Sequence, residues 1–244
     1  MQSKGLEKTA AVPGLSLGFD LTALLKSNDI DSRVQRHLVR VYSTLAVAVF
    51  AASVGVLLDI SISVAGYTTA ALVLGLLVAL FALPKKNVGQ RFTVLLSLAV
   101  CWGVNLGGLV HYALATDPEV VGVAFVGTTV IFGCFTLSAL VERRRMYLYM
   151  GAFFSSAILC LLLVGLVNIF VQSAAIYSLE LYGGLLIFCF YVLFDTQLIV
   201  EKASLGDDDF VAHAFELFLD FVNLFVRILT ILLRKREGRD DSAA

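Results

Sequence analysis

Four polar side chains recur on one face of the last long apolar segment of the chain, residues 210–233. They are Glu216, Asp220, Asn223 and Arg227, and they are spaced four, three and four residues apart. This spacing places them on one face of a helix. Charged groups at membrane depth are costly, so they face a bundle interior or a water-filled cavity. The segment therefore predicts a helix that enters a bilayer but turns this face away from lipid.

A single acid, Asp195, interrupts the preceding apolar segment, residues 178–200. It follows Glu180 by fifteen residues, or about 22 Å along a helix, so the two acids cannot both lie at one membrane interface. The sequence leaves two alternatives. Asp195 faces the polar stripe of the last segment inside the bundle, or it lies a turn or two from Glu201 and Lys202 and reaches the lipid headgroups.

If Asp195 and Asp220 meet, physical chemistry constrains the pair. Two close carboxylates in a low dielectric cannot both stay ionised, so the pair is expected to share a proton. Ionised, it offers hard oxygen ligands suited to transient calcium binding, and protonated, it can latch two helices together. The hypothesis is that the pair controls a cation path, with no resident cofactor. The alternative for Asp220 is a structural network in which Arg227 neutralises a carboxylate.

Further titratable groups lie close to this segment in the sequence. Asp207, Asp208 and Asp209 form an acidic triplet in the predicted loop at residues 204–209. The triplet either concentrates cations at a channel mouth or is simply a solvated loop. His213 lies one turn before Glu216 and could extend the titrating stripe. No twelve-residue loop ends in a glutamate as in an EF-hand.

The composition indicates an integral membrane protein with one helical domain. The 244 residues are 59% hydrophobic and 15% charged, whereas soluble domains are about 45–50% apolar and about 25% charged. The net charge of −1 gives no electrostatic case for nucleic-acid binding. A G-x-S-x-G elbow and a clustered-histidine motif are both absent, so no enzyme is expected. The four cysteines lack C-x-x-C spacing and are predicted to be free thiols packed in helices.

Seven segments approach or exceed the roughly 20 apolar residues that span a bilayer as a helix. They are residues 41–58, 60–83, 92–116, 120–141, 146–171, 178–200 and 210–233. These runs are apolar on both faces, unlike the strands of a membrane barrel. The predicted fold class is an all-α integral membrane protein with seven transmembrane helices, the seventh being central. A polar lead (residues 1–36), without the apolar core of a signal peptide, precedes the membrane domain (37–234), and a charged tail (235–244) follows it.

Lysine and arginine alternate between the predicted loops and give an orientation. Lys85, Lys86 and Arg91 lie in the second-to-third loop, and three arginines (143–145) lie in the fourth-to-fifth. The positive-inside rule then places these loops and the N-terminus in the cytosol. The basic residues after position 233 conflict with this rule if the seventh segment spans. That segment either spans, surrounded by the other six, or re-enters and leaves on the same side.

Four stretches resemble the Bax inhibitor family (transmembrane Bax-inhibitor-motif proteins), specifically its eukaryotic, reticulum-resident branch. They are HLVRVY at 37–42, CFTLSAL at 134–140 with the arginines that follow, VLFDTQLIVEKA at 192–203 and ELFLDFVNLF at 216–225. The resemblance covers residues 30–235 and is most specific in the last two segments. It implies a seven-helix fold whose last helix is central.

The resemblance also implies a function. The expectation is a pH-sensitive calcium leak channel in the endoplasmic reticulum membrane, which lowers stored calcium and suppresses programmed cell death, with Bcl-2-type proteins as partners. The family's paired aspartates correspond to Asp195 and Asp220. Some members are described with an arginine of the second helix near the pair, but residues 41–83 contain neither lysine nor arginine here. The sequence does not decide whether Arg227 substitutes for it.

Two other functions compete with this expectation. One is a non-transporting scaffold that acts through partner binding by its loops or by the charged residues 234–241. The other is an intramembrane aspartyl protease, which also uses two aspartates. Its signatures are Tyr-Asp and Gly-x-Gly-Asp, whereas Phe194 precedes Asp195 and Leu219 precedes Asp220 here. The protease is therefore disfavoured.

Overall fold

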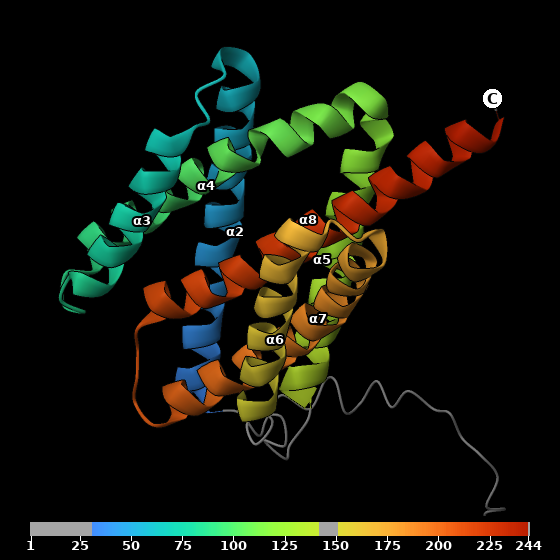
Figure 1. The fold of residues 1–244 in the computed structure, drawn as a ribbon. Coiled ribbons are helices and arrows are strands. Elements are labelled where there is room, and N and C mark those ends of the chain that lie inside the picture. Colours follow the sequence, from blue (N-terminus) through green and yellow to red (C-terminus); the bar gives the residue numbers. More distant parts are fainter. Residues whose placement is uncertain (1–30, 142–150, 244) are drawn as a thin grey trace, which may run out of the picture.

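The computed structural model describes residues 31–141 and 151–243, and every regular element in these ranges is a helix (Figure 1). The predicted all-α class is confirmed. The N-terminal residues 1–30 and the arginines 143–145 lie outside the described residues. The helices are α2 (Ser32–Ile62), α3 (Tyr67–Ala82), α4 (Val88–Thr116), α5 (Pro118–Val141), α6 (Gly151–Val171), α7 (Ala174–Ser204) and α8 (Phe210–Ala243).

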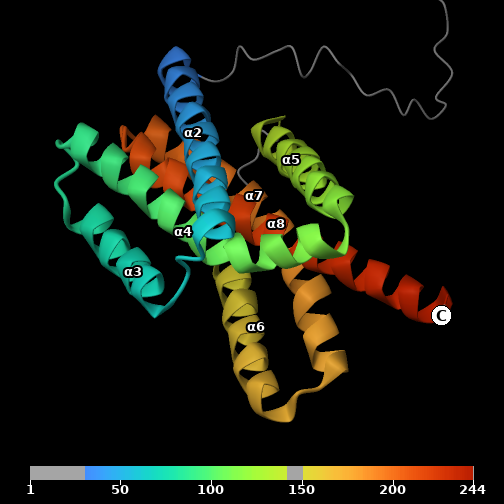
Figure 2. The ribbon, with the colours of Figure 1, turned by 90° about the horizontal axis from the view of Figure 1, so that it is seen from above.

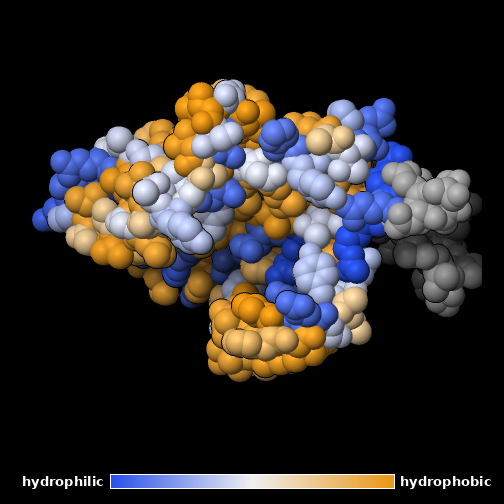
Figure 3. Space-filling model, turned by 45° about the horizontal axis from the view of Figure 1, so that its top comes forward, coloured by the Kyte–Doolittle hydropathy of each residue, from blue (hydrophilic) through white to orange (hydrophobic). Residues whose placement is uncertain are grey.

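Five of these helices, α2, α4, α5, α6 and α7, are long and apolar enough to cross a membrane. Large apolar side chains cover much of the surface (Figure 3). On α6, for example, Phe153, Ile169 and Phe170 are exposed. Side chains of this kind are stable in lipid rather than in water, which fits an integral membrane protein.

The turn between the first two helices lies later than predicted. The first span was expected to end at residue 58, but α2 continues to Ile62 and α3 has only 16 residues. The Asp59 carboxylate is buried and accepts a hydrogen bond of 2.7 Å from the backbone N–H of Ala65. The acid thus stabilises the turn after α2, where Ser63 adopts a left-handed conformation. At about 24 Å, α3 is shorter than the roughly 30 Å hydrocarbon core.

Helix α8 lies at the centre of the molecule, as predicted. It packs against α2, α4, α5 and α7, and both ribbon views show it crossing between these helices (Figures 1 and 2). Leu217, Phe218, Leu224 and Leu229 on α8 are completely buried. This burial explains how a helix with several charged residues is stable here, because its neighbours rather than lipid surround it.

The two ends of α8 lie at opposite ends of the bundle. Its start is held by the loop of residues 205–209, which pairs with residues near the start of α2 and around the turn between α3 and α4. Its other end pairs with the turn between α4 and α5, where Arg236 contacts Asp117 at 3.0 Å. Arg234 also donates to Ser178 at the start of α7. We call these the loop end and the C-terminal end.

This arrangement favours the spanning alternative for α8 over re-entry. It also extends the helix, because residues 235–243, expected as a separate tail, continue α8. The basic residues after position 233 have local partners at the C-terminal end, namely Asp117, Ser178 and the ring of Tyr177. Such pairing reduces the cost of placing positive charge on that side.

Candidate functional site

Asp195 and Asp220 face each other across the seam between α7 and α8. The two helices are adjacent and antiparallel, because only the loop of residues 205–209 joins them. The two carboxyl groups lie within electrostatic range of each other. The structure thus brings together the two acids that the sequence singled out, and their function stays a prediction.

The surroundings of Asp220 leave one of its oxygens without a conventional donor. Asp220 is 4% exposed. Among the residues that the structure describes, no N–H or hydroxyl group donates to its Oδ2 atom. Tyr42 of α2 lies within electrostatic reach of Asp220, but its hydroxyl contacts Thr196 Oγ1 at 3.4 Å. A buried acceptor of this kind is costly unless a proton or a cation satisfies it.

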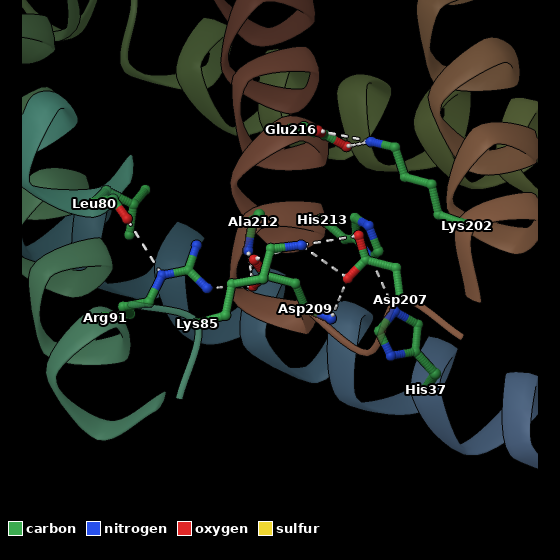
Figure 4. A network of polar contacts seen from close by, with 10 residues as sticks. All are labelled: His37, Leu80, Lys85, Arg91, Lys202, Asp207, Asp209, Ala212, His213 and Glu216. Carbon is green, nitrogen blue, oxygen red and sulfur yellow. Dashed lines mark hydrogen bonds and ion pairs between the residues drawn. The ribbon is translucent and has the colours of Figure 1, made fainter. Parts of the chain in front are cut away.

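An ion pair accompanies the two aspartates along the same seam. Lys202 Nζ of α7 lies 3.2 Å and 3.4 Å from the two carboxylate oxygens of Glu216 on α8 (Figure 4). The charges of Lys202 and Glu216 both act on Asp195. We did not predict Lys202 as a site residue. Its position seven residues after Asp195, on the same face of α7, was the signal in the sequence.

Asn223 and Arg227 do not join the aspartate pair. Asn223 donates to the carbonyl oxygen of Leu219 in its own helix at 2.8 Å. Arg227 donates to the carbonyl oxygen of Glu180 at 2.8 Å and lies over the ring of Phe188. Arg227 therefore makes its described contacts beside Glu180, away from the aspartate pair. The polar stripe of α8 splits into two separate groups.

His213 points toward α2 rather than toward Glu216. Its Nδ1 atom lies 2.9 Å from Nε2 of His37, and the side chain is almost completely buried (Figure 4). One ring must donate and the other accept, so a doubly protonated pair would place two donors face to face. This contact could not be predicted from the sequence, because 176 residues separate the two histidines.

The acidic triplet is neither a free solvated loop nor a free cation-collecting mouth. Each of its carboxylates has a basic partner from another part of the fold. Figure 4 shows the partners of Asp207 and Asp209. The pairs are Asp207 with Lys85 at 3.1 Å, Asp208 with Arg33 at 2.7 Å and Asp209 with Arg91 at 2.6 Å. These pairs tie the α7–α8 loop to α2 and to the turn between α3 and α4.

The pKa values of half-buried Asp207 and exposed Asp208 follow from these partners. The hydrogen bond from Arg33 and its charge lower the pKa of Asp208 below the ordinary aspartate value. For Asp207, partial burial acts upward, but the hydrogen bond and charge of Lys85 outweigh it, so its pKa is also lowered. Both carboxylates are therefore ionised at neutral pH.

The third pair, Asp209 with Arg91, is buried, since each side chain is only 4% exposed. Arg91 also donates to the carbonyl oxygen of Leu80 at 3.2 Å. Asp209 precedes α8, and its carboxylate accepts from the backbone N–H of Ala212 at 3.2 Å, which is N-cap geometry. Asp209 thus fixes the start of the helix that carries Glu216 and Asp220.

Comparison with known proteins identifies the family. The family model described as inhibitor of apoptosis-promoting Bax1 matches residues 34–237. The chain belongs to the Bax inhibitor 1 family. It is 41% identical to Bax inhibitor 1 of Bos taurus over 227 residues, which cover 91% of this chain and 95% of that protein. The corresponding values are 40% over 227 residues for Homo sapiens (91% and 95%) and 38% over 234 residues for Oryza sativa (96% and 94%).

The side chains that could bind a metal ion in this Bax inhibitor 1 family member are scattered among the described residues. Within residues 31–141 and 151–243, no group of three or more His, Cys, Asp or Glu side chains could hold a metal ion. A resident calcium ion takes six to eight oxygen ligands.

Proposed function

We propose that this Bax inhibitor 1 family member is a pH-sensitive calcium leak channel of the endoplasmic reticulum membrane. It lowers stored calcium and thereby suppresses programmed cell death, without acting as an enzyme and without a resident cofactor. The observation that carries the proposal is the pair of Asp195 and Asp220, two acids on adjacent helices whose charges act on each other, with Asp220 buried. In this proposal the pair shares one proton. Family membership supports the link to cell death.

In this proposal, protons and calcium ions compete for the same carboxylate oxygens of Asp195 and Asp220, and this competition opens and closes the path. With the shared proton in place, the carboxyl hydrogen bond holds α7 and α8 together and the path is closed. Loss of that proton leaves two carboxylates that repel each other and present hard oxygen ligands. A calcium ion then neutralises them during passage. Calcium flux is therefore expected to fall as the pH is lowered, because protons occupy the site.

Orientation and partners complete the proposal. The loop end carries Arg33, Lys85 and Arg91, and we place it with the N-terminus in the cytosol by the positive-inside rule. The C-terminal end then faces the lumen. Membrane lipid surrounds the bundle, and Bcl-2-type proteins are the expected protein partners.

A second candidate is a non-transporting scaffold that regulates cell death by binding such partners. The observation that favours it is the helical extension of α8 beyond Leu233, a buried residue that is followed by exposed or half-buried ones up to residue 238. Arg234, Lys235 and Arg236 of this extension are exposed. A charged helix that projects from the bundle is suited to contact a partner outside the bilayer core.

Purified protein in liposomes that contain a calcium dye separates the two candidates. We expect calcium flux without any partner, and we expect Asp195→Asn and Asp220→Asn to remove its pH dependence. Asp59→Asn is the matched control, because Asp59 is also buried but only caps a turn. If the wild-type protein moves no calcium, the channel is wrong and the scaffold is favoured. If both variants keep the wild-type pH profile, the gating role of the pair is wrong.

A further inference from the structure

Lys202 lies in a group of side chains that otherwise consists of acids. The seam between α7 and α8 contains Asp195, Glu216 and Asp220, whose charges act on one another. Within the described residues, Lys202 is the basic side chain whose charge acts on Asp195. Its Nζ atom contacts both carboxylate oxygens of Glu216. A single ammonium group thus offsets the negative charge of the seam.

The position of the Lys202–Glu216 bridge along the seam is between the loop end and the aspartate pair. Lys202 lies seven residues, or about 10 Å, from Asp195 in the direction of the loop end. Glu216 lies four residues, or about 6 Å, from Asp220 in the same direction. The two side chains are 32% and 31% exposed, whereas Asp220 is buried. Along the acidic seam, the Lys202–Glu216 bridge is therefore the outer group, nearer the loop end, and the aspartate pair is the inner group.

Other cations near these helices already have partners outside the seam. Arg227 is held by the carbonyl oxygen of Glu180 and the ring of Phe188. The three loop-end cations, Arg33, Lys85 and Arg91, pair with the acidic triplet. A lysine ammonium group can move aside when another cation binds, because it is a compact charge on a flexible side chain. Moving its ammonium group requires no change in the backbone.

We propose that Lys202 is a tethered counter-ion of this seam. Its ammonium group lies beside Glu216, in the position that a calcium ion entering from the loop end must take. The inference rests on the proposed function. It makes Glu216 the first residue that binds calcium on the path and Lys202 the residue that competes with calcium for Glu216. Lys202 acts as a positioning residue, since its charge is displaced by the ion and it coordinates none. Removing the ammonium group leaves Glu216 free to bind calcium.

The test is calcium flux from proteoliposomes as a function of calcium concentration. We expect Lys202→Gln to lower the half-saturating concentration by roughly two- to fivefold, the range for loss of a partly exposed ion pair. Lys202→Arg keeps the charge and is expected to restore the wild-type value. Lys235→Gln is the matched control, because it removes one lysine charge at the C-terminal end, away from the seam. An unchanged half-saturating concentration in Lys202→Gln would overturn the inference.

A second variant keeps the inference testable if Lys202→Gln does not fold. Glu216→Gln removes the first calcium ligand and frees Lys202 to face Asp195, so the half-saturating concentration is expected to rise. An unchanged or lower value would contradict the inference. The two proposals fail differently. Absence of wild-type flux refutes the channel itself, whereas flux that responds to Asp195→Asn but to neither seam variant refutes only the role of Lys202.

Discussion

At the scale of the residue, Asp195 and Asp220 differ from other acids of the described chain in the partners of their carboxyl groups. Asp59 accepts from a backbone N–H. Most of the other acids considered above have basic partners, as in the pairs Asp117–Arg236, Asp207–Lys85, Asp208–Arg33, Asp209–Arg91 and Glu216–Lys202. Asp195 and Asp220 instead have each other. An acid–acid contact has no cation of its own, so a proton or a passing cation is expected to reduce its internal repulsion.

The exposed ion pair between Asp208 and Arg33 is expected to play no part in pH sensing near neutrality. Arg33 lowers the pKa of Asp208, so this acid is ionised throughout the range of about pH 5 to 8. Its contribution is present above the ordinary aspartate pKa and is lost only as the pH falls through the lowered value. Asp208→Asn is therefore expected to leave the pH profile of calcium flux unchanged between about pH 5 and 8. A shifted profile would place the sensor at the loop end.

The sequence predicted which polar residues share a face of α8, but it could not predict their partners on other helices. Helical periodicity fixes the relative directions of Glu216 and Asp220, which explains the success. It carries no information on the rotation of one helix against another. The contact between His37 and His213 and the buried bridge between Arg91 and Asp209 therefore became visible only in the structure. The same holds for the contacts of Arg227.

At the scale of the element, close packing of α2 against α4 depends on two glycines that sequence inspection did not single out. A Cβ atom on Gly103 would overlap the backbone carbonyl of Ala52, and one on Gly55 would overlap that of Val100. By contrast, Gly108 of the same helix α4 has open space around it. Composition identifies small residues, but only the helix rotation decides which of them face a neighbour.

Gly103→Ala is therefore expected to destabilise the protein, whereas Gly108→Ala is a matched control in the same helix. Backbone atoms cannot rotate away as a side chain can, so the new methyl group must push α2 and α4 apart. Overpacking of this kind costs about 1–3 kcal/mol. Alanine at Gly108 is expected to be neutral or slightly stabilising, because it favours the helix. Thermal unfolding in detergent measures both, and equal melting temperatures would contradict the close approach.

At the scale of the whole molecule, the central position of α8 couples the two ends of the bundle. Ion pairs attach its start to α2 and to the turn between α3 and α4, and its end contacts the turn between α4 and α5 and the start of α7. The seven segments and their order were predictable from apolar runs. The side of the C-terminus was not, because the positive-inside rule counts charges without knowing their partners.

The two chain termini are expected on opposite sides of the membrane. Epitope tags at the N-terminus and after Ala244, probed by protease protection in sealed microsomes, measure this directly. We expect the N-terminal tag to be digested and the C-terminal tag to be protected. Digestion of both tags in intact vesicles would contradict a spanning α8 and favour the re-entrant alternative.

The exchange of a proton for calcium at Asp195 and Asp220 is tested most directly by proton release. Calcium is added to purified protein in weakly buffered detergent solution, and a pH indicator records the protons set free. We expect about one proton per bound calcium ion, because the pair shares one proton. We also expect this release to disappear in Asp195→Asn and to persist in Asp59→Asn. Calcium binding without proton release, or undiminished release in Asp195→Asn, would contradict the exchange.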